Sequence, residues 1–98
     1  MAKRIVWTFK AIQMRQEILD YWFQRTGNRK YSRKLARQFQ ETILYISKNE
    51  YLGRSTNIPD VRIAVSGHYL VVYKVFDDFI EIYTIFDSRQ DPDKLNFE

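Results

Sequence analysis

The 98-residue chain contains no cysteine, one histidine, three glycines and two prolines. The absence of cysteine excludes disulfide bonds, thiolate metal sites and a cysteine nucleophile, and it fits a reducing cytoplasm. A single histidine cannot form a metal site, and no cluster of acidic residues has the spacing of metal ligands. The few glycines form no phosphate-binding loop. We therefore expect neither a metal nor another cofactor.

Long apolar runs are also missing. No run approaches the roughly 20 residues that a membrane-spanning helix needs. Residues 1–11 are positively charged, but Thr8 and Lys10 interrupt the apolar core of a signal peptide. We therefore expect a cytoplasmic protein without a membrane segment. Apolar residues make up 45% of the chain, as in folded proteins, and the length suits a single domain over residues 1–98.

Positive and negative charges are segregated along the chain. Residues 1–76 contain 14 basic and 5 acidic side chains, a net charge of +9, whereas residues 77–98 contain 2 basic and 7 acidic ones, a net charge of −5. A basic surface of this kind favours a polyanion, although a solvated helix face has the same pattern. Tyr31 lies within the basic stretch and suits base stacking. The candidate nucleic-acid-binding residues there are Arg29, Lys30, Arg33, Lys34 and Arg37.

Apolar residues recur at spacings of three and four in two segments, which predicts two amphipathic helices. The first occupies about Lys10–Arg25, with Thr8 as its N-cap and either Gly27 or Asn28 as the residue that ends the helix in the left-handed conformation. The second occupies about Ser32–Lys48, with Ser32 as its N-cap. The short connection predicts an antiparallel hairpin. The apolar stripe of the second helix consists of Leu35, Phe39, Ile43 and Ile46.

The remaining apolar segments predict strands. We expect one strand at Arg4–Thr8 and, after a loop at Asn49–Asp60, a meander of three strands at Val61–Val65, Tyr69–Phe76 and Phe79–Phe86. The order of elements predicts an α+β fold with an N-terminal strand. In this fold an antiparallel helix hairpin packs on one face of a small twisted antiparallel sheet.

Simple alternation assigns the residues of the last strand to the two faces of the sheet. It places Ile80, Ile82 and Phe86 on one face, and Tyr83 and Ile85 on the other. The helices can cover only one face, so the other needs a further cover. The loop, the tail and Trp7 are possible covers, and a partner protein is the favoured one.

Three arginines near the predicted sheet are candidates for holding a phosphate group. Arg62 lies on an otherwise apolar strand, and its planar guanidinium group suits phosphate. Arg54 in the loop and Arg89 after the last strand converge with it if the loop and the tail fold over the sheet. The alternative is that these arginines pair with carboxylates such as Asp87 or Asp91.

Candidates for proton transfer are fewer. Glu50 lies in the loop near Arg54 and is a weak candidate for a general base. His68 lies in the predicted turn between two strands and is expected to be an ordinary turn residue. No Ser/His/Asp triad is present. The residues alone therefore leave the catalytic role open.

Several short motifs occur in a fixed order along nearly the whole chain. None is specific alone, but together they resemble the RelE/ParE superfamily of toxins from bacterial type II toxin–antitoxin systems. The motifs are Ile5-Val6-Trp7-Thr8, Ala11, Ile18 with Tyr21-Trp22, Tyr51-Leu52-Gly53, Val61-Arg62, Gly67-His68-Tyr69, Val72-Tyr73-Lys74-Val75, and Ile82 with Ile85-Phe86-Asp87-Ser88-Arg89-Gln90-Asp91-Pro92.

The resemblance implies a cognate antitoxin as partner and one of two targets. RelE-like members cleave mRNA in the ribosomal A site without a metal, and Arg62 and Arg89 match the arginines of that branch, with Arg54 assisting. ParE-like members instead poison DNA gyrase and hydrolyse nothing. Leu70 and Leu95 stand where the nuclease branch often has arginine and tyrosine.

The leading expectation is a toxin that acts as a metal-independent endoribonuclease on ribosome-bound mRNA. Its catalytic residues would be Arg62, Arg89 and Glu50. The alternatives are a gyrase inhibitor without nuclease activity and a degenerate, non-toxic interaction module.

Overall fold

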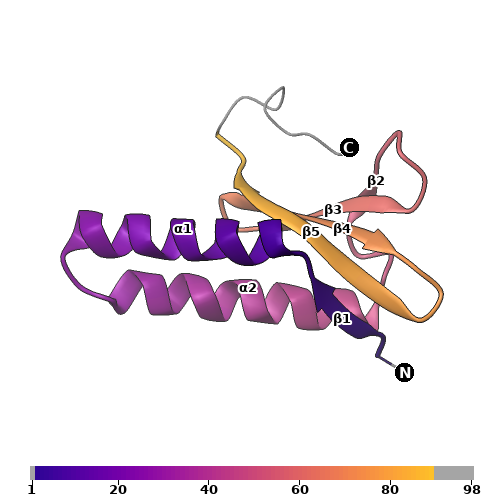
Figure 1. Ribbon diagram of the computed structural model, residues 1–98, viewed down its shortest axis with the longest axis horizontal. Coiled ribbons are helices and arrows are strands. Elements are labelled where there is room, and N and C mark those ends of the chain that lie inside the picture. Colours follow the sequence, from indigo (N-terminus) through magenta and orange to yellow (C-terminus); the bar gives the residue numbers. More distant parts are fainter. Residues whose placement is uncertain (1, 90–98) are drawn as a thin grey trace.

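The computed structural model describes residues 2–89, which form two helices and one five-stranded sheet. The strand order is β1-β5-β4-β3-β2, and both helices lie on one face of the sheet (Figure 1). This arrangement confirms the predicted α+β fold. Among the described residues, no helix is long and apolar enough to cross a membrane. The elements are β1 (Arg4–Trp7), α1 (Phe9–Thr26), α2 (Lys30–Lys48), β2 (Arg54–Ser55), β3 (Val61–Ser66), β4 (Tyr69–Val75) and β5 (Phe79–Asp87).

Thr8 and Gly27 begin and end α1 as the sequence predicts. The Thr8 hydroxyl accepts a hydrogen bond from the Ala11 N–H at 3.0 Å and donates to the Tyr83 carbonyl at 2.7 Å. Gly27 has a φ of 78° and donates its N–H to the Phe23 carbonyl at 2.9 Å. Thr8 therefore both caps the helix and fastens its start to β5.

The predicted N-cap role of Ser32 is wrong, because α2 begins two residues earlier, at Lys30. The Lys30 N–H donates to the Asn28 side-chain carbonyl at 2.9 Å, so Asn28 satisfies the start of the helix. Ser32 is buried between the helices, where its hydroxyl donates to the Leu19 carbonyl at 2.7 Å. Ser32 therefore joins the hairpin instead of capping it.

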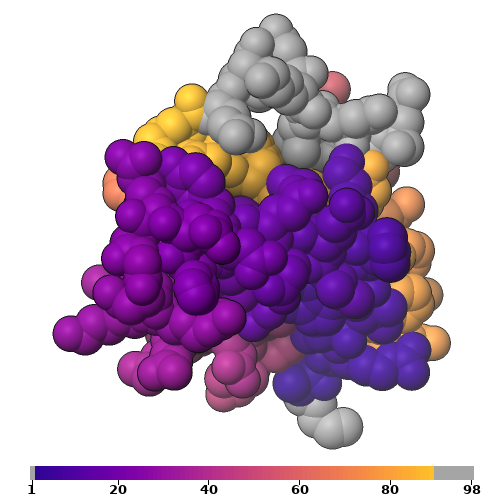
Figure 2. All heavy atoms as spheres, turned by 60° about the vertical axis from the view of Figure 1, so that its left-hand side comes forward, coloured from indigo at the N-terminus to yellow at the C-terminus, as the bar shows by residue number. Residues whose placement is uncertain are grey.

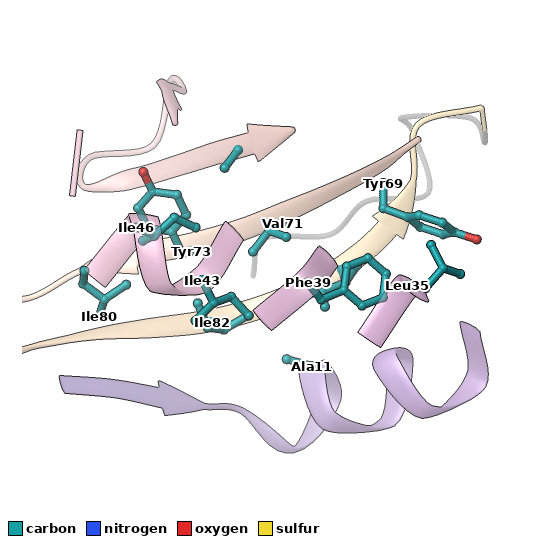
Figure 3. Close-up of a cluster of buried hydrophobic side chains, with 12 residues drawn as sticks. Ala11, Leu35, Phe39, Ile43, Ile46, Tyr69, Val71, Tyr73, Ile80 and Ile82 are labelled. Carbon is teal, nitrogen blue, oxygen red and sulfur yellow. The ribbon is translucent and has the colours of Figure 1, made fainter. Parts of the chain in front are cut away.

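The main core lies between α2 and the sheet, with Ala11 of α1 at its edge (Figure 3). The predicted apolar stripe of α2 is buried, and Phe39 and Ile46 are completely inaccessible to solvent. Each large side chain buried in this way stabilises the fold by about 1.5–3 kcal/mol. The sheet residues beneath the helices include Val71, Tyr73, Ile80, Ile82 and Ile85.

The sheet is mixed and not wholly antiparallel, because β1 runs parallel to β5. Arg4 lies opposite Phe79 and Trp7 lies opposite Ile82, whereas the other strand pairs are antiparallel. Parallel neighbours need a long crossover between them, and here almost the whole chain separates the two strands. The sequence identified the strand but not its direction.

β5 contains one extra residue, Tyr83, opposite the step from Val72 to Tyr73 in β4. This bulge reverses the alternation of side chains for the rest of β5. Ile85 therefore joins the core under the helices, and Phe86 packs on the opposite face. The predicted grouping of Phe86 with the first isoleucines of the strand is wrong for this reason.

A smaller apolar cluster on the opposite face of the sheet is covered in part by the chain itself. Its buried members are Val61, Ile63 and Val72, and Ile58 from the loop before β3 packs against them. Val65 on the same strand is 71% exposed. The loop therefore provides part of the cover that this face needs, and the expected contribution of a partner stays a prediction.

Candidate functional site

Arg62 fastens the loop between α2 and β2 to the sheet. Its Nη1 donates to the Gly53 carbonyl at 2.6 Å, and its guanidinium group lies over the Tyr51 ring at 4.9 Å. Arg62 is half-buried and lies opposite Tyr73 of β4 and Ser55 of β2. Within the described residues, the geometry therefore gives Arg62 a clear role in holding the loop.

Tyr73 of β4 holds the same loop through its side-chain hydroxyl. Its hydroxyl accepts from the Gly53 N–H and donates to the Glu50 carbonyl, each at 2.8 Å. Tyr73 is completely buried, and this burial raises the pKa of its hydroxyl. A Cβ atom on Gly53 would lie 2.8 Å from the Ile63 backbone and from the Tyr73 hydroxyl, so the close packing requires glycine. Sequence reasoning named Tyr73 and the loop residues Tyr51-Leu52-Gly53 in separate motifs, but it did not connect the two or give Tyr73 a role in holding the loop.

Glu50 lies in this loop, but its carboxylate is paired. It accepts from Lys3 Nζ at 2.7 Å, and Lys3 also donates to the Phe76 carbonyl at 2.9 Å. Arg54 is exposed on β2, directly after the glycine that Arg62 binds. The structure thus brings Glu50, Arg54 and Arg62 together around one loop. A hollow of about 250 Å³ is lined mainly by the segment between β2 and β3, and Tyr51 and Arg62 are also in its wall.

Arg89 lies at the other end of the sheet, where it is paired with Asp87. Its Nε and Nη2 donate to the two carboxylate oxygens at 2.9 and 2.7 Å. The Arg89 hydrogen bonds lower the pKa of Asp87 below its usual range. This geometry confirms the alternative in which Arg89 pairs with Asp87. The other predicted partner, Asp91, lies outside the described residues, as does Leu95.

Arg62 and Arg89 do not converge. Arg62 lies opposite Tyr73, and Asp87 lies opposite Tyr69, four residues away along β4. At about 3.4 Å per residue the two positions are separated by about 14 Å, and Arg89 lies two residues further along the chain. The two guanidinium groups are bound to partners toward opposite ends of the strand.

A cleft of about 510 Å³ lies next to Arg89, between α1 and the end of β5. Trp22 Nε1 donates to the Tyr69 hydroxyl at 2.7 Å in its wall, and burial raises the pKa of Tyr69. Sequence reasoning gave no role to Tyr69 and did not connect it with Trp22, because this contact spans 47 residues of sequence. The side chains around the cleft are Met14, Glu17, Ile18, Tyr21, Trp22, Arg25, Tyr69, Phe86, Asp87 and Arg89.

His68 is exposed in the turn between β3 and β4, as expected. Its carbonyl oxygen, and not its imidazole ring, accepts the hydrogen bonds from Ser88. No group of histidine, cysteine, aspartate or glutamate residues within residues 2–89 could hold a metal ion.

The candidate nucleic-acid-binding residues form one exposed surface at the start of α2, which we call the basic face. No ion pair to any of them occurs among the described residues. The Arg29 guanidinium group lies 4.2 Å from the centre of the Phe23 ring. Tyr31 presents only part of its ring for the predicted stacking, because the half-buried ring packs edge-on against Trp22 at 4.8 Å. The basic face consists of Arg29, Lys30, Arg33, Lys34 and Arg37.

Two solved structures share the fold of this chain. It is similar to a chain of the chromosomal ParDE TA system from P. aeruginosa, with a TM-score of 0.75 and 21% identity over 88% of this chain and 96% of that chain. It is also similar to the YoeB dimer from Staphylococcus aureus, with a TM-score of 0.58 and 17% identity over 86% of this chain and 94% of that chain.

The sequence assigns the family. The family described as the ParE toxin of the type II toxin-antitoxin system, parDE, matches residues 5–92. The chain therefore belongs to the ParE toxin family, and the predicted RelE/ParE resemblance is confirmed. Membership of a toxin–antitoxin family implies an antitoxin as partner. A search of curated protein sequences gives no significant match.

Proposed function

We propose that this chain is a growth-inhibiting toxin that binds DNA gyrase on DNA and does not cleave RNA. The family match supports a ParE-type toxin, and the resemblance described above connects the ParE-like branch with gyrase. The observation that carries the proposal is the arrangement of Arg62, Arg89 and Glu50. These side chains do not assemble around a common phosphate.

Cleavage of RNA by its own 2′-hydroxyl needs a base for the hydroxyl proton and cations at the phosphate, all within hydrogen-bond distance. Arg62 is bound to the loop carbonyl, and Arg89 is bound to Asp87 more than a dozen ångströms away along the sheet. The Glu50 carboxylate is paired with Lys3. An inhibitor that acts by binding does not require these groups to converge.

The toxin exposes apolar side chains on its helix hairpin and on the loop between α2 and β2, where the cognate antitoxin can bind. Phe9 and Ile12 lie one turn apart on α1, and Tyr45 and Tyr51 are exposed near the end of α2. Exposed apolar side chains of this kind are typical of protein interfaces. We infer that the antitoxin covers at least part of this surface when it neutralises the toxin.

Two assays on the purified protein test the proposal. In the first, gyrase, supercoiled plasmid and ATP are mixed with the toxin, and linear DNA is measured after protein removal. In the second, a translating extract receives the toxin, and ribosome-bound mRNA is examined by primer extension. We expect gyrase-dependent DNA breaks and intact mRNA. Cleaved mRNA without DNA breaks would support the nuclease hypothesis instead.

Glu50→Gln is the matched variant, because the amide keeps the size of the side chain and an oxygen acceptor for Lys3. The nuclease hypothesis predicts a loss of about 10²–10⁴-fold in mRNA cleavage with this variant. The gyrase proposal predicts unchanged DNA breakage. If the wild-type protein has neither activity and expression leaves growth unaffected, the non-toxic interaction module is the better description.

A further inference from the structure

We propose that the basic face binds the phosphate backbone of duplex DNA. The inference rests on the proposed function, because it supplies a direct DNA contact for a toxin that acts on gyrase bound to DNA. It stands on four features of the helix hairpin: the spacing of the cations, the absence of competing carboxylates, the aromatic contacts and the position of the hairpin tip.

The five cations follow one side of α2. With 3.6 residues per turn and a rise of 1.5 Å per residue, positions 29 to 37 cover an arc of about 140° and a length of about 12 Å. One strand of duplex DNA presents a phosphate about every 3.4 Å along the helix axis. The basic face therefore matches three to four successive phosphates of one strand.

No carboxylate competes for these cations. The sequence contains no acidic residue between Asp20 and Glu41, and within residues 2–89 the ion pairs lie elsewhere, at Lys3 and Arg89. The first turn of α2 contains no acidic residue, although the positive end of the helix dipole favours one there. This charge arrangement opposes helix stability, which supports a role in binding an anion.

The aromatic residues indicate a duplex and not a single strand. Single-stranded nucleic acids are bound by a positively charged groove together with exposed aromatic rings on which the bases stack. Of the aromatic side chains near the basic face in the sequence, Tyr31 and Phe23 are half-buried and Phe39 is completely buried. Tyr31 packs on Trp22, and the Phe23 ring is covered by Arg29. The basic face thus offers charge without a stacking surface, as backbone contacts to a duplex require.

The position of the basic face leaves the rest of the protein free for gyrase. The helix hairpin extends beyond the sheet, so its tip lies at the opposite end of the molecule from β2 (Figure 1). Seen from the hairpin end, the purple side chains of this region project outward at the lower left (Figure 2). The tip can therefore lie against a cylindrical duplex while the sheet and the loop face a protein.

Fluorescence anisotropy with a labelled 20-base-pair duplex tests the inference between 50 and 200 mM KCl. For three to four phosphate contacts we expect a slope of about −3 in a plot of log association constant against log salt concentration. The double variant Arg33→Gln/Arg37→Gln is expected to bind more weakly and to lose about 2 from the magnitude of this slope. Circular dichroism confirms that the variant is folded.

Lys48→Gln is the matched control, because Lys48 is exposed on the same helix at its other end. It removes one positive charge from the protein but none from the basic face. We expect its slope to equal that of the wild type. The inference is wrong if the slope falls equally per removed charge in Lys48→Gln and in the double variant, or if the double variant leaves the slope unchanged. It is also wrong if the protein binds a single-stranded RNA of the same length more tightly than the duplex.

The duplex assay contains no gyrase, so the two proposals fail separately. If the protein binds the duplex but cleaves mRNA, the proposed action on gyrase is wrong and the proposed DNA-binding surface is supported. If gyrase-dependent breaks occur without salt-dependent duplex binding, the proposed DNA-binding surface is wrong and the action on gyrase is supported. In the gyrase assay we expect the double variant to produce at least tenfold fewer breaks, and full activity would contradict a role of this surface in toxicity.

Discussion

At the residue scale, Tyr73 holds two backbone groups of the loop that no other described residue binds with its side chain. Tyr73→Phe removes one hydroxyl and leaves the Gly53 N–H and the Glu50 carbonyl without this partner. We expect the free energy of unfolding to fall by about 1–3 kcal/mol, measured by urea denaturation. Tyr45→Phe at an exposed position is the control and is expected to change it by less than about 0.5 kcal/mol.

The raised pKa of Tyr73 also predicts how stability depends on alkaline pH. Burial favours the neutral hydroxyl, so the pKa in the folded protein lies above the ordinary value of 10.0. The stabilising contribution is complete below that ordinary value and is lost as the pH rises through the folded pKa. We expect melting temperatures between pH 8 and 11 to fall more steeply for the wild type than for Tyr73→Phe. Parallel curves would contradict this expectation.

The pair of Asp87 and Arg89 predicts the opposite behaviour in acid. The pKa of Asp87 is lowered below its ordinary value of 3.8, mainly by the hydrogen bonds from Arg89. Its contribution is therefore present above the ordinary value and is lost as the pH falls through the folded pKa. Asp87→Asn is expected to cost less than about 1 kcal/mol at pH 7, because the pair is partly exposed. The difference from the wild type should shrink as the pH falls below 3.8 in urea titrations.

At the scale of the element, the first turn of α2 has its charge arranged against the helix dipole. Lys30 lies in the first turn of the helix, next to its positive end. Lys30→Glu is expected to raise the free energy of unfolding by about 0.3–1 kcal/mol at low salt, and less at 1 M salt. Thermal melting measures the change. Lys48→Glu places the same charge change in the last turn, where we expect it to destabilise the protein. If both variants shift the melting temperature in the same direction, the dipole explanation is wrong.

The sequence predicted the helices well because their signals are local. The buried stripe of α2 follows from the spacing of its apolar residues, and the ends of α1 follow from Thr8 and Gly27. Ser32 misled the prediction because a serine in this position suits an N-cap, whereas Asn28 provides the bond and Ser32 faces α1. The bulge at Tyr83 has no local signal, because it is defined by the register of β4 against β5.

The candidate site was less predictable than the fold because its contacts connect distant residues. The sequence identified Arg62, Arg89 and Glu50 as notable, but their partners decide what each side chain can do. Lys3 binds Glu50 across 47 residues of sequence. Pairing of this kind depends on the finished fold. The basic face was more accessible to prediction, because helical spacing alone places its cations on one side.

At the scale of the whole molecule, β1 protects one edge of the sheet. It pairs with β5 from Arg4 to Trp7, and Thr8 continues the contact with a backbone hydrogen bond to the Ile82 carbonyl at 3.1 Å. Replacing residues 2–8 with a Gly/Ser segment of equal length exposes the edge of β5. We expect this variant to lose its cooperative thermal transition and to aggregate, measured by circular dichroism and light scattering. Retention of wild-type melting would contradict the role assigned to β1.

The pairing of β1 with β5 also determines when the protein can first be active. Ile5 is synthesised 75 residues before its neighbour Ile80 on β5. The sheet cannot close around the core until β5 has been synthesised. A partly translated chain is therefore not yet a toxin, and an antitoxin already present in the cell has the full time of synthesis before it meets a folded target.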